Sequence, residues 1–366
     1  MIKKIKQILY LFLNPKLKSF SKLKVSRINV VNIGSAGDDD FSGMFWNKIK
    51  DFSNFFHFDP DNDEIKEKKN LKIFPYGLWD QNDTKEIFIT KFPYASSLFE
   101  PNDKLLKKFI NYDCHEVILK KKILLKKLDN IMTNKDELCD FIKIDAEGSE
   151  LNILNGSKNN LQNAYGLEVE INFIEKNLGS PDACEVITYL KNKNFDLFIL
   201  SRESWRKNKK NYIVGAYQLT WADAVFFKNQ ETIAFDLINL STAQKQIKIL
   251  KLLSIFLIYN LYDSAENYLK YFKKEKIISE QDYNNYTKII NKNIENNFLV
   301  FLKTFMLLIF SILFLPLSIV TFSKKIIMSN ISFIRILIQR FIILIQNLFR
   351  YSGPNKVSVS DSIKNL

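Results

Sequence analysis

The hydrophobic and polar positions change their period once along the chain, near Lys228. Before it, from about Arg27, short apolar runs end in glycine or aspartate and alternate with longer segments of mixed polarity. Buried parallel strands appear as continuous apolar runs, and helices connect them across the faces of the sheet. The region therefore predicts an α/β fold with a mostly parallel, doubly wound sheet.

The expected strands are short apolar or alternating runs bounded by turn residues. They are INVVNI at 28–33, FFHF at 55–58, KIFPYGLW at 72–79, KEIFITKF at 85–92, VILKKKILL at 117–125, DFIKI at 140–144, GLEVEINF at 166–173, FDLFIL at 195–200 and WADAVFFK at 221–228. Helix-length segments separate several of them, chiefly 150–164 and 181–194.

After Lys228 the strand signals stop, and apolar residues recur at helical spacing. A helical extension is therefore expected over residues 229–297, after a first domain over residues 27–228. Residues 304–323 are uncharged and nearly long enough to cross a bilayer, although Pro316 interrupts them.

Residues 298–350 as a whole predict hydrophobic, membrane-associating helices, and residues 351–366 predict a flexible tail. The alternative is that these helices bury their apolar faces against each other or against a partner subunit.

The net charge of +13 is concentrated at the two ends of the chain. Residues 1–27 carry eight bases and no acid, and residues 298–366 carry eight bases and one acid, whereas the middle is nearly neutral. A neutral middle argues against a nucleic-acid groove. Basic ends rich in Ile, Leu and Phe predict contact with an anionic membrane surface, so residues 1–26 are interpreted as a basic amphipathic segment or a docking helix. The expected location is cytoplasmic and membrane-associated.

Three separated cysteines and two histidines give neither zinc-site spacing nor a paired disulfide set. They predict reduced, buried thiols, and no residue is assigned to a metal. The oligomeric state is left open.

The first chemical motif follows the first expected strand, as Asn32-Ile33-Gly34-Ser35-Ala36-Gly37. Glycines at such a point allow a tight turn and a close approach of the backbone to a ligand. Asp59 ends the next strand, where a carboxylate can accept hydrogen bonds from both hydroxyls of a ribose. The alternative is a structural turn and a solvated aspartate.

The second motif, Lys143-Ile144-Asp145-Ala146-Glu147-Gly148-Ser149-Glu150, places three carboxylates within six residues at a strand end. Such a group favours a neighbouring cation or hydroxyl groups that donate hydrogen bonds to it. The alternative is that Asp145 and Glu147 cap the helix that begins near Ser149, with Glu150 in its first turn.

Taken in order, NIGSAG, FFHFDPD, YASSLFEP, DFIKIDAEGSELNILNGS, GLEVEINF and WADAVFFK resemble the FkbM methyltransferase family from about Arg27 to Lys228. The resemblance implies a Rossmann-like methyltransferase fold with S-adenosyl-L-methionine as its cofactor. It also implies methyl transfer to oxygen, often a sugar hydroxyl in glycan biosynthesis. The implied cofactor-binding residues are Asn32, Gly34, Ser35, Gly37 and Asp59.

Two departures from the family pattern concern the cofactor loop. Asn32 replaces an acidic residue, and Ser35-Ala36 replaces the usual Ala-Asn pair. Since an amide can orient the loop but carries no charge, a weaker cofactor affinity is expected.

The catalytic carboxylates are expected to be Asp145 and Glu147, one orienting the acceptor hydroxyl and one taking its proton, with the assignment left open. Lys143, Glu168 and Glu170 are expected to bind the sugar or glycan acceptor, because the two glutamates share one face of their strand. The alternative is an inactive, membrane-associated binding or scaffold protein with the same fold. A nicotinamide dehydrogenase is disfavoured, because no G-x-G-x-x-G follows the first strand.

Overall fold

The computed structural model describes residues 26–34, 46, 50–60, 66–110, 112–134, 137–207, 217–295, 302 and 306. The predicted amphipathic segment, the membrane-associating helices and the flexible tail lie outside these residues, apart from Ser26, Leu302 and Met306. Within the described ranges, every helix is too short or too polar to span a bilayer.

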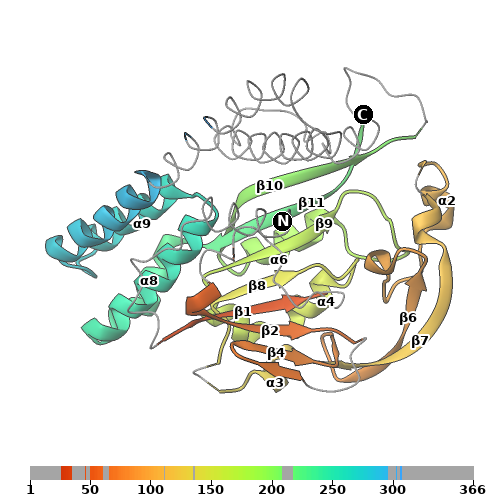
Figure 1. Cartoon of the computed structure of the whole chain (residues 1–366), viewed down its shortest axis with the longest axis horizontal. Helices are drawn as coiled ribbons and strands as arrows, with labels where there is room; N and C mark the ends of the chain where they lie inside the picture. The colour runs from red at the N-terminus through yellow and green to blue at the C-terminus, as the bar shows by residue number, and fades with distance from the viewer. Residues whose placement is uncertain are drawn as a thin grey trace, which may run out of the picture. The chain divides into compact units, whose positions relative to one another are not determined.

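The main sheet has eight described strands in the order β10-β11-β9-β8-β1-β2-β4-β3 (Figure 1). Neighbouring strands from β4 to β9 are parallel, whereas β11 is antiparallel to β9 and β10, and β3 is antiparallel to β4. The predicted α/β fold with a mostly parallel sheet is therefore confirmed. The strands are β1 (Ile28–Ile33), β2 (Ser53–Phe58), β3 (Lys66–Lys68), β4 (Leu71–Phe74), β8 (Phe141–Ile144), β9 (Gly166–Asn172), β10 (Phe195–Trp205) and β11 (Gln218–Lys228).

The strand order reverses between β1 and β8. From β1 the chain adds β2 and β4 on one side, and it then returns to add β8 and β9 on the other side. Ligands of open α/β sheets bind beyond the carboxyl ends of the strands at such a switch point. The topology therefore points to the ends of β1, β2 and β8.

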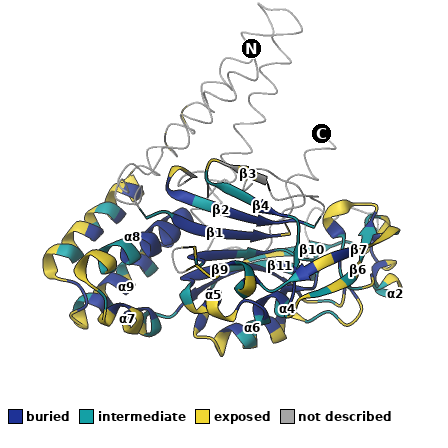
Figure 2. Ribbon diagram, turned by 90° about the horizontal axis from the view of Figure 1, so that it is seen from below, coloured by how far each residue is buried: buried dark blue, intermediate teal, exposed yellow. Residues whose placement is uncertain are grey.

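One hydrophobic core cluster lies on one face of this sheet, and Val30 and Phe141 on the other face are fully buried as well. Val31, Ile142 and Leu167 are fully buried in this cluster, and they lie in register on neighbouring parallel strands, so their side chains share one face. Ile153 and Leu154 of the first helix after β8 contribute to the same core, which Figure 2 shows in dark blue. The helices that contribute to this core are α3 (Leu128–Ile131), α4 (Glu150–Asn155), α5 (Lys158–Asn163) and α6 (Ala183–Lys191).

A second sheet of three strands, in the order β5-β7-β6, was not expected as a separate unit. Its strands are β5 (Gly77–Leu78), β6 (Asp83–Thr90) and β7 (Val117–Lys126). Trp79, Ile123 and Leu125 form its own small core. The sequence cannot assign these strands to a sheet, because β7 is mostly exposed and its lysines follow no clear alternation. The short helix α2 (Asp103–Leu106) lies between β6 and β7 in the chain.

The expected helical extension is confirmed by α7 (Gln230–Ile238), α8 (Thr242–Ile258), α9 (Tyr262–Lys274) and the helical residues 280–295. The chain divides into two compact units at Leu252–Leu253, within α8. In the C-terminal unit, Ala265, Tyr268, Leu269 and Phe272 are buried at helical spacing along α9. The predicted domain boundaries at residues 228 and 297 stay predictions.

Candidate active site

A hollow lies at the carboxyl ends of β1, β2 and β8. Its lining includes Gly34, Asp59, Asp145 and Glu147, four of the residues singled out from the sequence. They come from three different strand ends at the point where the strand order reverses. The structure therefore brings the two sequence motifs together, as their positions after parallel strands predict.

Gly34 permits the closest backbone approach in this hollow. Its φ is +83°, and a Cβ built on it would lie 1.7 Å from the carbonyl oxygen of Asp145. The adjacent residues are also tied together, because the amide of Asp145 donates to the carbonyl oxygen of Ile33 at 3.0 Å. No side chain fits at position 34, so its glycine is required by both conformation and space.

The loop after β8 holds an uncommon backbone conformation at Glu147, with φ of +49°. The carbonyl oxygen of Glu147 accepts hydrogen bonds from Ser97 Oγ at 2.6 Å and Asn177 Nδ2 at 2.8 Å. Glu150 Oε1 accepts from the amides of Ala146 at 3.0 Å and Gly148 at 3.2 Å. These bonds fix the loop that presents the carboxylates.

The alternative role of Asp145 and Glu147 as helix caps is wrong. The N-cap of α4 is Ser149, and Glu150 lies in the first turn as expected. The side chain of Glu147 instead contacts Lys176.

Lys176 lies among the carboxylates of the site. Its Nζ is 2.7 Å from Glu147 Oε2 and 2.8 Å from Glu170 Oε1, and its side chain is 3% exposed. Carboxylate oxygens of Asp145, Glu147 and Glu170 lie within 4.8 Å of one another. Three convergent carboxylates have the composition of a cation site, and the ammonium of Lys176 provides a positive charge there.

Asp145 and Glu147 of this cluster have raised carboxyl pKa values. Burial raises the pKa of Asp145 to about 6 and that of Glu147 to about 8, and Glu170 adds to both rises, whereas Lys176 opposes them. Burial alone lowers the pKa of Lys176, but the two glutamates raise it above its ordinary value. The three carboxylates outnumber the two ammonium groups beside them, those of Lys176 and Lys143, so the cluster retains a proton near neutral pH. That proton belongs to the coupled group rather than to one residue.

The two candidate catalytic carboxylates differ in exposure. The side chain of Asp145 is 36% exposed, whereas that of Glu147 is 13% exposed and bound to Lys176. Asp145 is therefore the carboxylate that an incoming acceptor reaches more readily.

The expected acceptor-binding residues lie next to Asp145 on one face of the sheet. Lys143 pairs in register with Glu168, and its Nζ is 3.7 Å from Asp145 Oδ2. Glu170 is two residues further along β9, so it shares this face by period two. Asp223 of β11 is in register with Glu170, and its pKa is raised to about 7 by burial and then by Glu168. No site role was predicted for Asp223 from the sequence.

The remaining cofactor-binding predictions are only partly described. Asn32 is buried on β1, in register with Lys143. Asp59 is 3% exposed and lines the hollow, and its amide donates to Phe74. Ser35 and Gly37 lie outside the described residues. The individual binding roles of all these residues stay predictions.

Lys176, Ser97, Asn177 and Glu150 were not given site roles from the sequence. Lys176 lies 29 residues after Glu147, in a loop whose sequence has no hydrophobic periodicity. Only Glu150 carried a signal, because an acid in the first turn of a helix is a known capping pattern.

The family model of the methyltransferase FkbM domain matches residues 4–197, more than half of the chain. No curated protein matches the chain significantly. The solved structure of the Bacillus subtilis M1A22 tRNA methyltransferase TrmK is similar over 78% of this chain and 97% of its own, with 10% identity and a TM-score of 0.24. On the family match, the chain belongs to the FkbM methyltransferase family and is a methyltransferase that uses S-adenosyl-L-methionine.

Proposed function

We propose that this enzyme transfers the methyl group of S-adenosyl-L-methionine to a hydroxyl oxygen of a sugar or glycan. The observation that carries the proposal is the group of carboxylates at the end of β8, of which Asp145 opens onto the hollow. Carboxylates accept hydrogen bonds from sugar hydroxyls, and one near its pKa can take the hydroxyl proton.

The residues of the hollow fit part of the cofactor. Gly34 leaves space that a Cβ would fill, and Asp59 offers a carboxylate for the two ribose hydroxyls. The hollow measures about 110 Å³, below the ~300–1,000 Å³ of sites that enclose a whole ligand. The described residues thus accommodate one part of the cofactor. When bound, the cofactor supplies a methyl group on a positively charged sulfur.

In this proposal, Asp145 is the general base. It is the more exposed carboxylate, and a pKa of about 6 leaves it mostly ionised above neutral pH. Glu147 and Glu170 hold Lys176, and this ion-paired group keeps the loop and its charges in place. Since a methyl transfer is a displacement that requires alignment, the fixed loop also orients the acceptor oxygen.

Acceptor recognition is assigned to the charged face beside Asp145. Lys143 and Glu168 can hydrogen-bond hydroxyls of one sugar ring, whereas Glu170 beside them is 5% exposed and paired with Lys176. Tyr94 is 56% exposed and lines the hollow, so its ring offers a surface on which a sugar face can stack.

The test uses the purified full chain with S-adenosyl-L-methionine and a panel of nucleotide-linked sugars, and mass spectrometry locates the added methyl group. Asp145→Asn is expected to lower kcat by about 100-fold or more, because general-base catalysis contributes roughly that factor, while cofactor affinity is retained. Asp103→Asn, an exposed aspartate of α2, is the matched control and keeps full activity. Methylation on nitrogen, or full activity of the Asp145 variant, would overturn the proposal.

We also propose that the ends of the chain bring the enzyme to the cytoplasmic face of an anionic membrane. The support is the eight bases and no acid within residues 1–27, together with the apolar composition of residues 298–350. The full chain should cosediment with vesicles of phosphatidylglycerol and phosphatidylcholine, and not with phosphatidylcholine alone. Equal binding to both vesicles would exclude the electrostatic part. Extraction by carbonate would then separate surface contact from a bilayer-spanning segment.

A further inference from the structure

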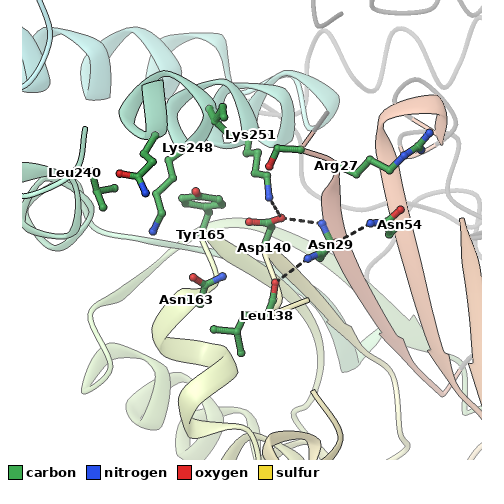
Figure 3. A pocket seen from close by; sticks show the side chains of 13 residues that line it. Arg27, Asn29, Asn54, Leu138, Asp140, Asn163, Tyr165, Leu240, Lys248 and Lys251 are labelled. Carbon is green, nitrogen blue, oxygen red and sulfur yellow. Dashed lines mark hydrogen bonds and ion pairs between the residues drawn. The ribbon is translucent and has the colours of Figure 1, made fainter. Parts of the chain in front are cut away.

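A second polar hollow lies at the amino ends of the parallel strands, where β1, β2, β8 and β9 begin. This end of the strands is called the amino edge of the sheet, and the end that carries the candidate active site is called the carboxyl edge. Its volume is about 650 Å³, within the range of small-molecule sites. The first half of α8 forms one wall (Figure 3). Since β1 has six residues at ~3.3 Å each, this hollow lies roughly 20 Å from the candidate active site. A ligand here cannot be the one that reacts at Asp145.

The middle of this hollow contains a buried ion pair. Lys251 Nζ is 2.7 Å from Asp140 Oδ2, and the same oxygen accepts the amide of Asn29 at 2.8 Å. The two side chains are 11% and 5% exposed. Asp140 is therefore already neutralised and hydrogen-bonded by the protein.

Two further cations line the hollow without a carboxylate of their own. Figure 3 shows Lys248 and Arg27 on opposite sides of the Lys251–Asp140 pair. Within the described part of the chain, neither has an ion-pair partner, and Arg27 donates one bond to the carbonyl oxygen of Ser53 at 3.2 Å. The lining thus has three bases and one acid. Cations gathered around a concave surface without balancing acids attract anions.

The rest of the lining is suited to an organic ligand. Asn54, Asn163 and Tyr165 contribute amide and hydroxyl groups, whereas Leu138 and Ile247 contribute apolar surface. A few placed polar groups on a partly apolar wall are typical of small-molecule sites. A bare inorganic ion would leave much of this volume unfilled.

We propose that this hollow is a second ligand site, which binds a small organic anion carrying a phosphate or carboxylate group through Lys248 and Arg27. The inference does not depend on the methyl acceptor, because no residue of the hollow contributes to the candidate active site. An anion bound there contacts the starts of the strands whose ends carry the catalytic loop, so it is placed to act as an effector rather than as a reactant.

The test is isothermal titration of the purified full chain with adenosine monophosphate and with citrate, at constant ionic strength. Lys248→Gln is expected to weaken the tighter of the two by about tenfold or more, as loss of a charged hydrogen bond does. Lys245→Gln, on the same helix and outside the lining, is the matched control and keeps the wild-type affinity. Lys143→Gln, at the other edge, also keeps it.

Three readings separate the outcomes. Thermal unfolding checks that each variant is folded, and titration with S-adenosyl-L-methionine should give the same affinity in Lys248→Gln as in the wild type, whether or not the sugar proposal holds. If the wild type binds one of the two anions more weakly than the other, the group carried by the tighter-binding anion, phosphate or carboxylate, is the preferred one. Absence of saturable binding by both probes, or an equal loss in the Lys245 and Lys248 variants, would overturn the second site.

Discussion

The two edges of the sheet each contain a buried ion pair, but the surrounding charges have opposite sign. At the carboxyl edge, Lys176 binds Glu147 and Glu170, and Asp145 adds a further acid. At the amino edge, Lys251 binds Asp140, and Lys248 and Arg27 nearby have no ion-pair partner among the residues that the structure describes. The excess charge at each edge determines what that edge attracts: a cationic or hydroxyl-bearing ligand at the first, and an anion at the second.

Lys176→Met gives the largest expected effect, because it leaves two glutamates buried without their cation. A loss of about 3–5 kcal/mol in the free energy of unfolding is expected near pH 8. Loss of the ammonium disfavours the ionised form of the carboxyls beside it, so the folded state of the variant favours protonated carboxyls. The deficit is therefore small below the ordinary carboxyl pKa and grows as the pH rises.

Urea unfolding at pH 5 and pH 8 measures this difference. Lys191→Met, at an exposed position of α6, is the control and should change little at either pH. A deficit that is equal at both pH values would show that lost packing, rather than lost charge, is the cause.

The sequence predicts the carboxyl edge better than the amino edge for a physical reason. Gly34, Asp59 and Asp145 each follow an apolar strand, and parallel topology brings such positions together. Lys176 lies in a loop 29 residues after Glu147, and Lys251 and Asp140 are 111 residues apart. Contacts of this kind depend on tertiary packing and have no periodic signal, so the second hollow and the three-stranded sheet emerged only from the structure.

Gly34→Ala is the next largest effect. Its Cβ would collide with the carbonyl oxygen of Asp145, and the residue would have to keep a positive φ. A loss of about 2–3 kcal/mol in unfolding free energy is expected, with loss of cofactor binding. Gly179→Ala separates the two causes, because Gly179 also has positive φ (+72°) but a Cβ there meets nothing within 4 Å. It should cost only about 1–2 kcal/mol, and equal losses in both variants would contradict the collision.

Lys251→Met should cost less than Lys176→Met, about 1–2 kcal/mol. It leaves one buried carboxylate instead of two, and Asp140 still accepts the amide of Asn29. Burial already raises the pKa of Asp140, so protonation relieves the unpaired charge readily. Urea unfolding beside the Lys176 variant tests the order. If Lys251→Met proves the more damaging change, the excess of acids at the carboxyl edge is not what makes Lys176 important.

The pH dependence of methyl transfer gives the smallest effect and the most direct measure of the charge around Asp145. A base with a pKa of about 6 is half ionised at pH 6, so kcat should fall about twofold between pH 8 and pH 6 and about tenfold per unit below that. Burial is the main cause of the raised pKa, and Lys143 opposes it. Lys143→Gln therefore moves this acid limb to higher pH, whereas Lys248→Gln, at the other edge, leaves it unchanged. If Lys143→Gln changes KM but leaves the acid limb of the kcat profile at the same pH, Lys143 binds the acceptor without setting the ionisation of Asp145. The two edges would then differ in shape rather than in charge.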